Sequence, residues 1–286
     1  MVKTGSMNSL KTVIIDINKL NKGDNLEALC SNISIDVIIG MREFIENSEQ
    51  IDFSDCFLIT DNREAAFYAK ETGVGIAVYT NGDNNAGDYP EALYCIDNLS
   101  EMTEKTLIRI YQRSRNLPWE ILLTDRCRVR EITVDDVNIL YEMYSDEDVR
   151  KYIENLYEDK EEEIQYTKDY IANQYRFYEY GMWIVEDIKS GEIIGRAGIF
   201  DRPNQEYQEL GFVFAKEYWG KGYAFEVLNA VMDYAYTELN VETLYAHAVH
   251  ENIRSGKILR KLGFEFDCES VVDGKVFDRF IYKKFL

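Results

Sequence analysis

The sequence contains little proline and no long hydrophobic run. Only 3 of its 286 residues are proline, and 46% of them are hydrophobic, a composition that favours packed cores over long disordered linkers. No stretch reaches the roughly eighteen apolar residues of a membrane-spanning helix. The first residues also lack the pattern of a signal peptide. We therefore expect a soluble, cytoplasmic protein that does not bind membranes.

Cysteine and histidine are also scarce. The cysteines are odd in number, scattered and without the spacing of metal ligands, so we expect buried, reduced thiols; they are Cys30, Cys56, Cys95, Cys127 and Cys268. The only two histidines, His247 and His250, are an odd number of residues apart in a predicted strand. They should therefore point to opposite faces, which disfavours a shared metal ion and favours a structural role for each.

Acidic residues greatly outnumber basic ones. With 52 acidic and 32 basic residues, the formal net charge is −20, and the basic residues form no cluster that could bind phosphates. Such a chain should repel nucleic acid, which we exclude as a direct partner. The same field would attract a cation such as an amine-bearing peptide, a polyamine or an aminoglycoside. The simpler alternative is that the acidity only keeps the protein soluble.

The length of the chain and its hydrophobic pattern predict two domains, residues 1–117 and 118–286, joined near Pro118. In the first domain, short apolar runs alternate with helical patterns, which predicts a small parallel, Rossmann-like α/β sheet. The predicted strands are 12–17, 56–60, 74–79 and 92–96, and the predicted helices are 63–72 and 101–115.

The second domain is predicted to be a mixed α/β fold built around one sheet. Its expected strands are 127–132, 182–187, 193–200, 207–214, 243–249, 264–272 and 276–284, and its expected helices are 134–144, 161–177, 223–236 and 253–262. The strand that ends at Phe214 runs into a turn containing Gly220 and Gly222, after which a long helix starts. Glycines let the backbone approach an anion, and the free amides of a helix N-terminus attract it, so this turn suits a pyrophosphate.

A second motif follows about thirty residues later. It consists of a strand, a capping Asn252, a helix and a terminating Gly263. Together the two motifs resemble the GNAT superfamily of acetyl-CoA-dependent N-acetyltransferases, over roughly residues 119–286. The family turn reads Gln/Arg-x-x-Gly-x-Gly/Ala; here its first position differs, whereas the glycine and Ala224 match. The turn, and the pair Gly195 and Arg196, are similar to the branch that acetylates protein N-termini, including those of ribosomal proteins.

This resemblance implies where acetyl-CoA binds. Its pantetheine would pair with the free edge of a strand at Phe212, Val213 and Phe214. Its pyrophosphate would lie on the turn residues Trp219, Gly220, Lys221, Gly222, Tyr223 and Ala224. In the family an asparagine contacts the cofactor at the position of Asn252, although Asn252 could equally cap its helix; Ser255 and Lys257 would lie near the outer end of the cofactor.

The resemblance also implies how an amine would be acetylated. Glu209 is our candidate proton acceptor, because family strands often carry a glutamate there; the alternative is a solvated strand carboxylate. Many members use a tyrosine to protonate the leaving thiolate, but the matching residue here is Leu259. Residues 144–180, rich in tyrosine and acid, would wall the acceptor site, although the acidic run 158–163 also suits a solvated helix start.

The first domain shows a weaker resemblance to the haloacid-dehalogenase-like fold. In that family the first strand ends in Asp-x-Asp, whose first aspartate is the nucleophile and whose second is the general acid/base, and a later strand ends in an aspartate before a helix. Here Asp16 matches the nucleophile and Asp61 the aspartate of the later strand. Asn18 replaces the second aspartate of the first pair, and no second acid follows Asp61. We therefore expect a degenerate domain that serves packing, substrate presentation or homodimer formation, although both aspartates could still bind a ligand at the strand ends.

Three functions follow from these patterns. The first is an acetyl-CoA-dependent N-acetyltransferase that acts on a protein N-terminus or a small cationic amine by direct attack. The second is a binding protein that retains affinity for acyl-CoA but has lost turnover, which the leucine at position 259 would explain. The third is a hydrolase located in the first domain.

Overall fold

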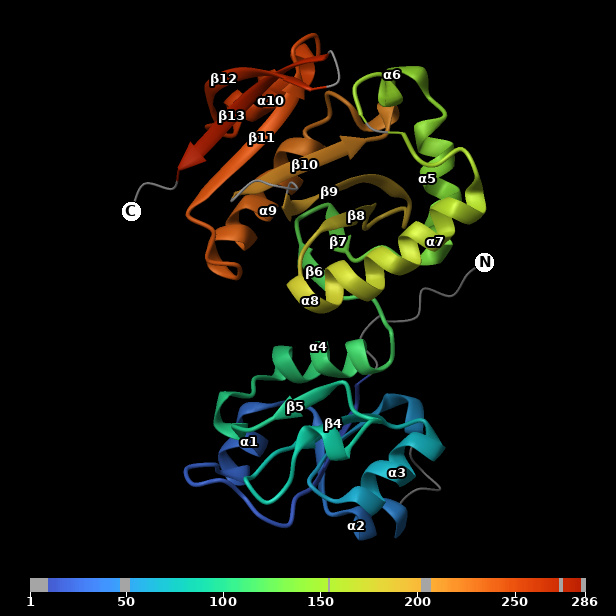
Figure 1. Cartoon of the computed structure of the whole chain (residues 1–286), viewed down its shortest axis with the longest axis vertical. Helices are drawn as coiled ribbons and strands as arrows, with labels where there is room; N and C mark the ends of the chain where they lie inside the picture. The colour runs from blue at the N-terminus through green and yellow to red at the C-terminus, as the bar shows by residue number, and fades with distance from the viewer. Residues whose placement is uncertain (1–9, 47–51, 154, 202–206, 273–274, 284–286) are drawn as a thin grey trace. The chain divides into compact units, whose positions relative to one another are not determined.

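The computed structural model describes residues 10–46, 52–153, 155–201, 207–272 and 275–283. The chain forms two compact units, Met1–Trp119 and Glu120–Leu286, each built around a sheet of its own (Figure 1). Among the helices of these described ranges, none combines the length and the apolar character that a membrane span requires.

The first unit is a parallel α/β sheet, as predicted. All four strand pairs are parallel, and the strand order is β2-β1-β3-β4-β5. The strands are β1 (Thr12–Asp16), β2 (Asp36–Ile39), β3 (Cys56–Thr60), β4 (Gly75–Tyr79) and β5 (Tyr94–Ile96). In a doubly wound sheet of this order, the switch point lies between β1 and β3, where side chains from the strand ends converge.

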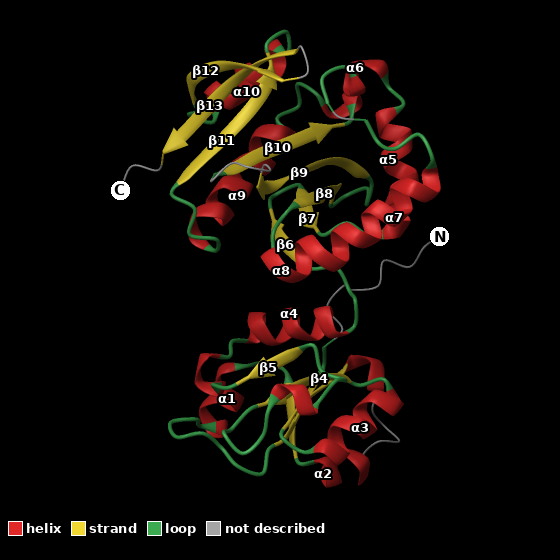
Figure 2. Ribbon diagram, in the orientation of Figure 1, coloured by secondary structure: helices red, strands yellow, loops and turns green. Residues whose placement is uncertain are grey.

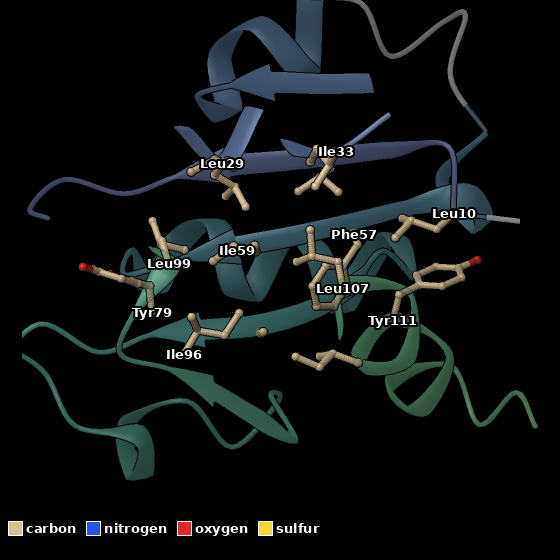
Figure 3. Close-up of a cluster of buried hydrophobic side chains, with 14 residues drawn as sticks. Leu10, Leu29, Ile33, Phe57, Ile59, Tyr79, Ile96, Leu99, Leu107 and Tyr111 are labelled. Carbon is tan, nitrogen blue, oxygen red and sulfur yellow. The ribbon is translucent and has the colours of Figure 1, made fainter. Parts of the chain in front are cut away.

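Helices cover both faces of this sheet (Figure 2). They are α1 (Leu26–Asn32), α2 (Met41–Glu46), α3 (Arg63–Thr72) and α4 (Glu104–Ser114). Strand side chains alternate between the two faces: Phe57 and Ile59 of β3 join α1 and α4 in one buried cluster (Figure 3), whereas Leu58 joins α2 and α3 in the other. Helices α1 and α2 and strand β2 were not predicted, although β2 contains the short apolar run 37–39.

The second unit is an eight-stranded mixed sheet with the order β12-β13-β11-β10-β9-β8-β7-β6. Its strands are β6 (Glu120–Leu123), β7 (Cys127–Arg130), β8 (Met182–Asp187), β9 (Ile193–Asp201), β10 (Gln208–Phe214), β11 (Thr243–Val249), β12 (Glu265–Val272) and β13 (Lys275–Lys283). Its helices are α5 (Val137–Tyr144), α6 (Glu147–Arg150), α7 (Lys160–Tyr170), α8 (Arg176–Tyr178), α9 (Tyr223–Thr237) and α10 (Ile253–Lys261). The mixed fold agrees with the prediction, but β6 was not predicted.

Two irregular features, one in the helices and one in the sheet, shape the functional site. The predicted helix 161–177 is interrupted by a π-helical turn, Ile171–Tyr175, between α7 and α8. In the sheet, β10 pairs with β9 along its whole length but with β11 only at Gln208 and Glu209. Beyond Glu209 the two parallel strands separate, which leaves an open edge on the second half of β10.

Candidate active site

The glycine turn lies between β10 and α9. A short 3-10 helix (Lys216–Tyr218) is followed by Gly220 and Gly222, whose φ angles are 72° and 85°. Both glycines and Lys221 are exposed, and no side chain of the described ranges caps the helix at Gly222. The first amides of α9 are therefore available to an anion, because a helix leaves these groups without intrahelical partners.

The turn is braced from outside by residues that the sequence analysis missed. Arg126, between β6 and β7, donates to the carbonyl of Lys221 (3.1 Å) and pairs with Glu226 in the first turn of α9 (2.6 Å). Thr124 donates to the same carboxylate (2.6 Å). Burial would raise the pKa of Glu226, but the hydrogen bonds from Thr124 and Arg126 outweigh it and lower that pKa. No sequence spacing reveals this contact, because it spans 100 residues.

Tyr223, the first residue of α9, is held by the same region. Its hydroxyl donates to Asp187 at the end of β8 (2.8 Å), and the guanidinium of Arg126 lies 4.0 Å from its ring centroid. Hydrogen bonds from Ser190 and then Tyr223 lower the pKa of Asp187, which therefore remains an anionic acceptor. The predicted residue Tyr223 is thus positioned by its side chain while its amide is part of the helix start.

The open edge of β10 contains the predicted residues Phe212, Val213 and Phe214. The amide of Ala215 donates to Ile194 of β9 (2.9 Å). In an antiparallel pair such bonds alternate, so Val213 bonds to β9, whereas the backbone groups of Phe212 and Phe214 face the open side. The indole of Trp219 donates to the carbonyl of Phe214 (2.7 Å) and closes the end of this edge.

Asn252, Ser255 and Lys257 lie at the start of α10. The side chain of Asn252 accepts from the amide of Ser255 (3.2 Å). Asn252 therefore caps the helix, which is one of the two roles considered for it above. Ser255 is half-buried and Lys257 is exposed. Leu259 is fully buried, so this position supplies neither a hydroxyl nor a surface that a thiolate could reach.

Glu209 is buried and lies beside a histidine. Its relative exposure is 1%, which excludes the solvated strand carboxylate considered above. The Nδ1 atom of His247 on β11 lies 2.9 Å from its Oε1 atom. Glu209 and Tyr245 are partners in the short β10–β11 pairing, and His247 is two residues further along the same face. His247 was predicted to be structural and Glu209 to be catalytic, but the tertiary structure brings the two side chains together.

This pair lies on the sheet face opposite α9. Trp183 of β8 packs against Tyr234 of α9, with ring centroids 5.5 Å apart. The next residue, Ile184, therefore points the other way, and so do its cross-strand neighbours Arg196 and Val213. Glu209 is four residues from Val213 and shares its face. The residues expected to meet an acceptor are thus on one face, and the helix of the glycine turn is on the other.

The tyrosine-rich segment has both buried and exposed parts. At the π-helical turn the ring centroids of Tyr170 and Tyr175 are 5.2 Å apart. The hydroxyl of Tyr170 accepts from the amide of Met182, and the hydroxyl of Tyr175 donates to the carbonyl of Met182. Burial raises the pKa of Tyr170 to about 12. The acidic run is not simply solvated: Asp159 caps α7, and Glu163, 3% exposed, accepts from the amide of Tyr157.

The strand ends of the first unit form a hydrogen-bonded polar network. The carboxylate of Asp61 accepts from the amide and side chain of Asn18 (2.8 and 3.0 Å), the amide of Lys19 (3.1 Å) and the side chain of Asn81 (2.8 Å). Asp16 accepts from the amide of Met41 (3.1 Å). Because the carboxylate of Asp61 already accepts four hydrogen bonds, this geometry favours a structural role for Asp61 over a role in hydrolysis.

Comparison with known proteins identifies the second unit. Residues 126–265 match the family model of the acetyltransferase (GNAT) domain. The uncharacterized N-acetyltransferase YoaA of Bacillus subtilis is 30% identical over 149 residues, which are 51% of this chain and 82% of the relative. The chain belongs to the GNAT family of acetyltransferases. The family and enzyme class predicted from the two glycine-containing motifs are therefore confirmed.

One sequence relative and one solved structure are named for their substrates. The spermidine N(1)-acetyltransferase of Vibrio cholerae is 25% identical over 145 residues, 50% of this chain and 80% of that enzyme. The structure of the RimL ribosomal L7/L12 alpha-N-protein acetyltransferase has a TM-score of 0.51 at 14% identity and covers 59% of this chain and 96% of its own. At this low identity, the RimL structure shows that the fold is shared and nothing more.

Proposed function

We propose that this GNAT acetyltransferase moves the acetyl group of acetyl-CoA to a primary amine by direct attack on the thioester. The observation that carries the proposal is the open edge of β10, which ends at a glycine turn whose helix amides have no side-chain cap. An extended pantetheine suits the backbone groups of Phe212 and the amide of Phe214, whose carbonyl already accepts from Trp219. A pyrophosphate suits the amides from Trp219 to Ala224.

Different groups around this edge would carry out the different steps of acetyl transfer. A backbone amide at the open edge would stabilise the oxyanion that develops on the thioester carbonyl. Glu209, on the acceptor face, would take the proton that the amine loses on forming the new C–N bond. Solvent would protonate the departing thiolate, because Leu259 is buried and has no proton to give. Asn252 would support the site by capping α10.

The acceptor we propose is a small cationic amine or a protein N-terminus. The formal charge of −20 favours a cationic substrate over an anionic one. Relatives with named substrates include a spermidine acetyltransferase. The protein would carry out this reaction in the cytoplasm, where acetyl-CoA is made, with no nucleic acid or membrane as partner, as a monomer or as a homodimer.

Thiol release from acetyl-CoA in the presence of spermidine, aminoglycosides and N-terminal peptides tests the proposal. We expect release with one class of amine, and a fall of about 10²- to 10⁴-fold in kcat for Glu209→Gln. Glu217→Gln, an exposed carboxylate before the turn, is the matched control and should keep full activity. Acetyl-CoA binding without release for every amine would instead support the non-catalytic alternative.

A further inference from the structure

A buried proton acceptor needs a way to lose its proton. Glu209 is only 1% exposed, so after one turnover a proton on its carboxyl group would not exchange directly with bulk water. A second group that touches it and reaches further towards solvent can carry this proton away. The proposed function therefore raises the question of which residue performs this step.

His247 meets these conditions. Its Nδ1 atom lies 2.9 Å from Oε1 of Glu209, within ion-pairing distance. Among the described residues this nitrogen forms no aligned hydrogen bond, so a rotation of the imidazole must align it with the carboxylate before a proton passes. The side chain of His247 is 9% exposed, compared with 2% for Glu209. The imidazole is thus the more exposed of the two groups.

The groups around His247 continue outward across the sheet. Arg279 of β13 is its cross-strand partner and forms an ion pair with Asp267 of β12, both side chains being 31% exposed. Tyr207 lies nearly parallel to the imidazole, with ring centroids 6.5 Å apart and planes 19° apart, and it also contacts Tyr245 (4.2 Å). A carboxylate and a cation thus lie on the two strands that flank the strand of His247.

We propose that His247 relays to solvent the proton that Glu209 takes from the acceptor amine. This inference rests on the proposed function. The amine nitrogen bonds to the acetyl carbon, and the C–S bond breaks with its electron pair leaving on the thiolate. The amine proton passes to Glu209, then to Nδ1 of His247, and the imidazolium releases a proton to water; the thiolate takes one proton from water. His247 acts through Glu209 and is therefore a positioning residue.

The coupling between the two groups can be measured without turnover. The chain has only two histidines, so nitrogen NMR spectra contain the imidazole signals of two residues, and His250→Gln assigns them. We expect Glu209→Gln to change the chemical shift of the Nδ1 atom of His247, because the variant replaces the carboxylate 2.9 Å away with a neutral amide. The signals of His250, which bonds to Asp278 instead, should stay unchanged. An unchanged Nδ1 shift for His247 would overturn the relay.

The catalytic effect is tested by comparing the two histidines. His247→Gln should lower kcat about 10- to 100-fold with less than a threefold change in KM, and should alter the pH profile of kcat; His250→Gln should change none of these. Added imidazole should restore part of the rate of His247→Ala but not of Glu209→Gln. A melting temperature within a few degrees of wild type confirms that each variant is folded.

A failure of the proton relay and a failure of the acetyltransferase proposal give different results in these experiments. If the wild type turns over and His247→Gln keeps its kcat and pH profile, the relay is wrong and the acetyltransferase proposal stands. If the wild type releases no thiol with any amine, the proposed function fails, and the relay fails with it even if the NMR coupling is present.

Discussion

Gly222 has a backbone conformation that only glycine adopts without strain. Its φ of 85° lies in the left-handed region, directly before the first residue of α9. We expect Gly222→Ala to cost about 1–3 kcal/mol at this turn and to weaken acetyl-CoA binding about tenfold in calorimetry. Gly82→Ala in the first unit, also at positive φ (76°) with open space around it, is the control. Equal affinity in both variants would contradict a role for this turn.

His250 should stabilise the fold in a pH-dependent way. Its hydrogen bond with Asp278 (2.8 Å) raises its pKa above the ordinary value of 6.5. A raised pKa means that the stabilisation is complete below about pH 6.5 and is lost as the pH rises through the higher, folded-state value. The melting temperature of wild type relative to His250→Gln should therefore be higher at pH 6 than at pH 9. A difference that grows with pH would contradict this assignment.

Leu259 cannot be converted into the missing catalytic acid. It is fully buried, so Leu259→Tyr should overpack the core and cost about 1–3 kcal/mol in the free energy of unfolding, with no gain in thiol release. Leu259→Met conserves the volume and should cost less than about 1.5 kcal/mol. Urea unfolding and a thiol assay measure both effects. A stable, faster Leu259→Tyr enzyme would show that this position does face the leaving group.

At the scale of elements, the start of α9 depends on its brace to the β6–β7 connection. The pKa of Glu226 is lowered by its hydrogen bonds with Thr124 and Arg126, against the effect of burial. A lowered pKa means that the stabilisation is complete above the ordinary value of 4.5 and disappears as the pH falls through the folded-state value.

This brace gives a prediction with a defined sign. The melting temperature of wild type should exceed that of Glu226→Gln by more at pH 7 than at pH 4, because only the ionised carboxylate pairs with Arg126. Calorimetry at several pH values measures the difference. Glu238→Gln at the far end of the same helix is an exposed control. A difference in melting temperature that is constant with pH would mean that the charge of Glu226 does not contribute to stability.

The elements differ in how far the sequence predicts them. Strands β3, β8 and β11 and helix α3 have the predicted bounds, because short β-branched runs between polar residues, and a helix that ends at Gly73 in the left-handed conformation, are local signals. The π-helical turn was not predicted. It is fixed by contacts of Tyr170 and Tyr175 with Met182, in a strand that follows later in the chain.

At the scale of the whole molecule, the net charge of −20 should guide cationic acceptors to the enzyme. Raising the salt concentration from about 0.05 to 0.3 M shortens the Debye length from roughly 14 to 6 Å. We therefore expect the KM for spermidine to rise several-fold, and the KM for a peptide of zero net charge to stay within about twofold. Steady-state kinetics measures both; equal shifts would show that the acidity serves solubility alone.

The sequence by itself determined the family, the fold class and the glycine turn. These depend on local patterns: alternating apolar runs, Gly220 and Gly222 before a helix, and the cap at Asn252. Only the tertiary structure decided which distant side chains meet. The pair of Glu209 with His247, the brace of Arg126 on Glu226 and the saturation of Asp61 each join residues more than 19 positions apart. Such contacts depend on how strands are ordered and where they separate, which no spacing along the chain encodes.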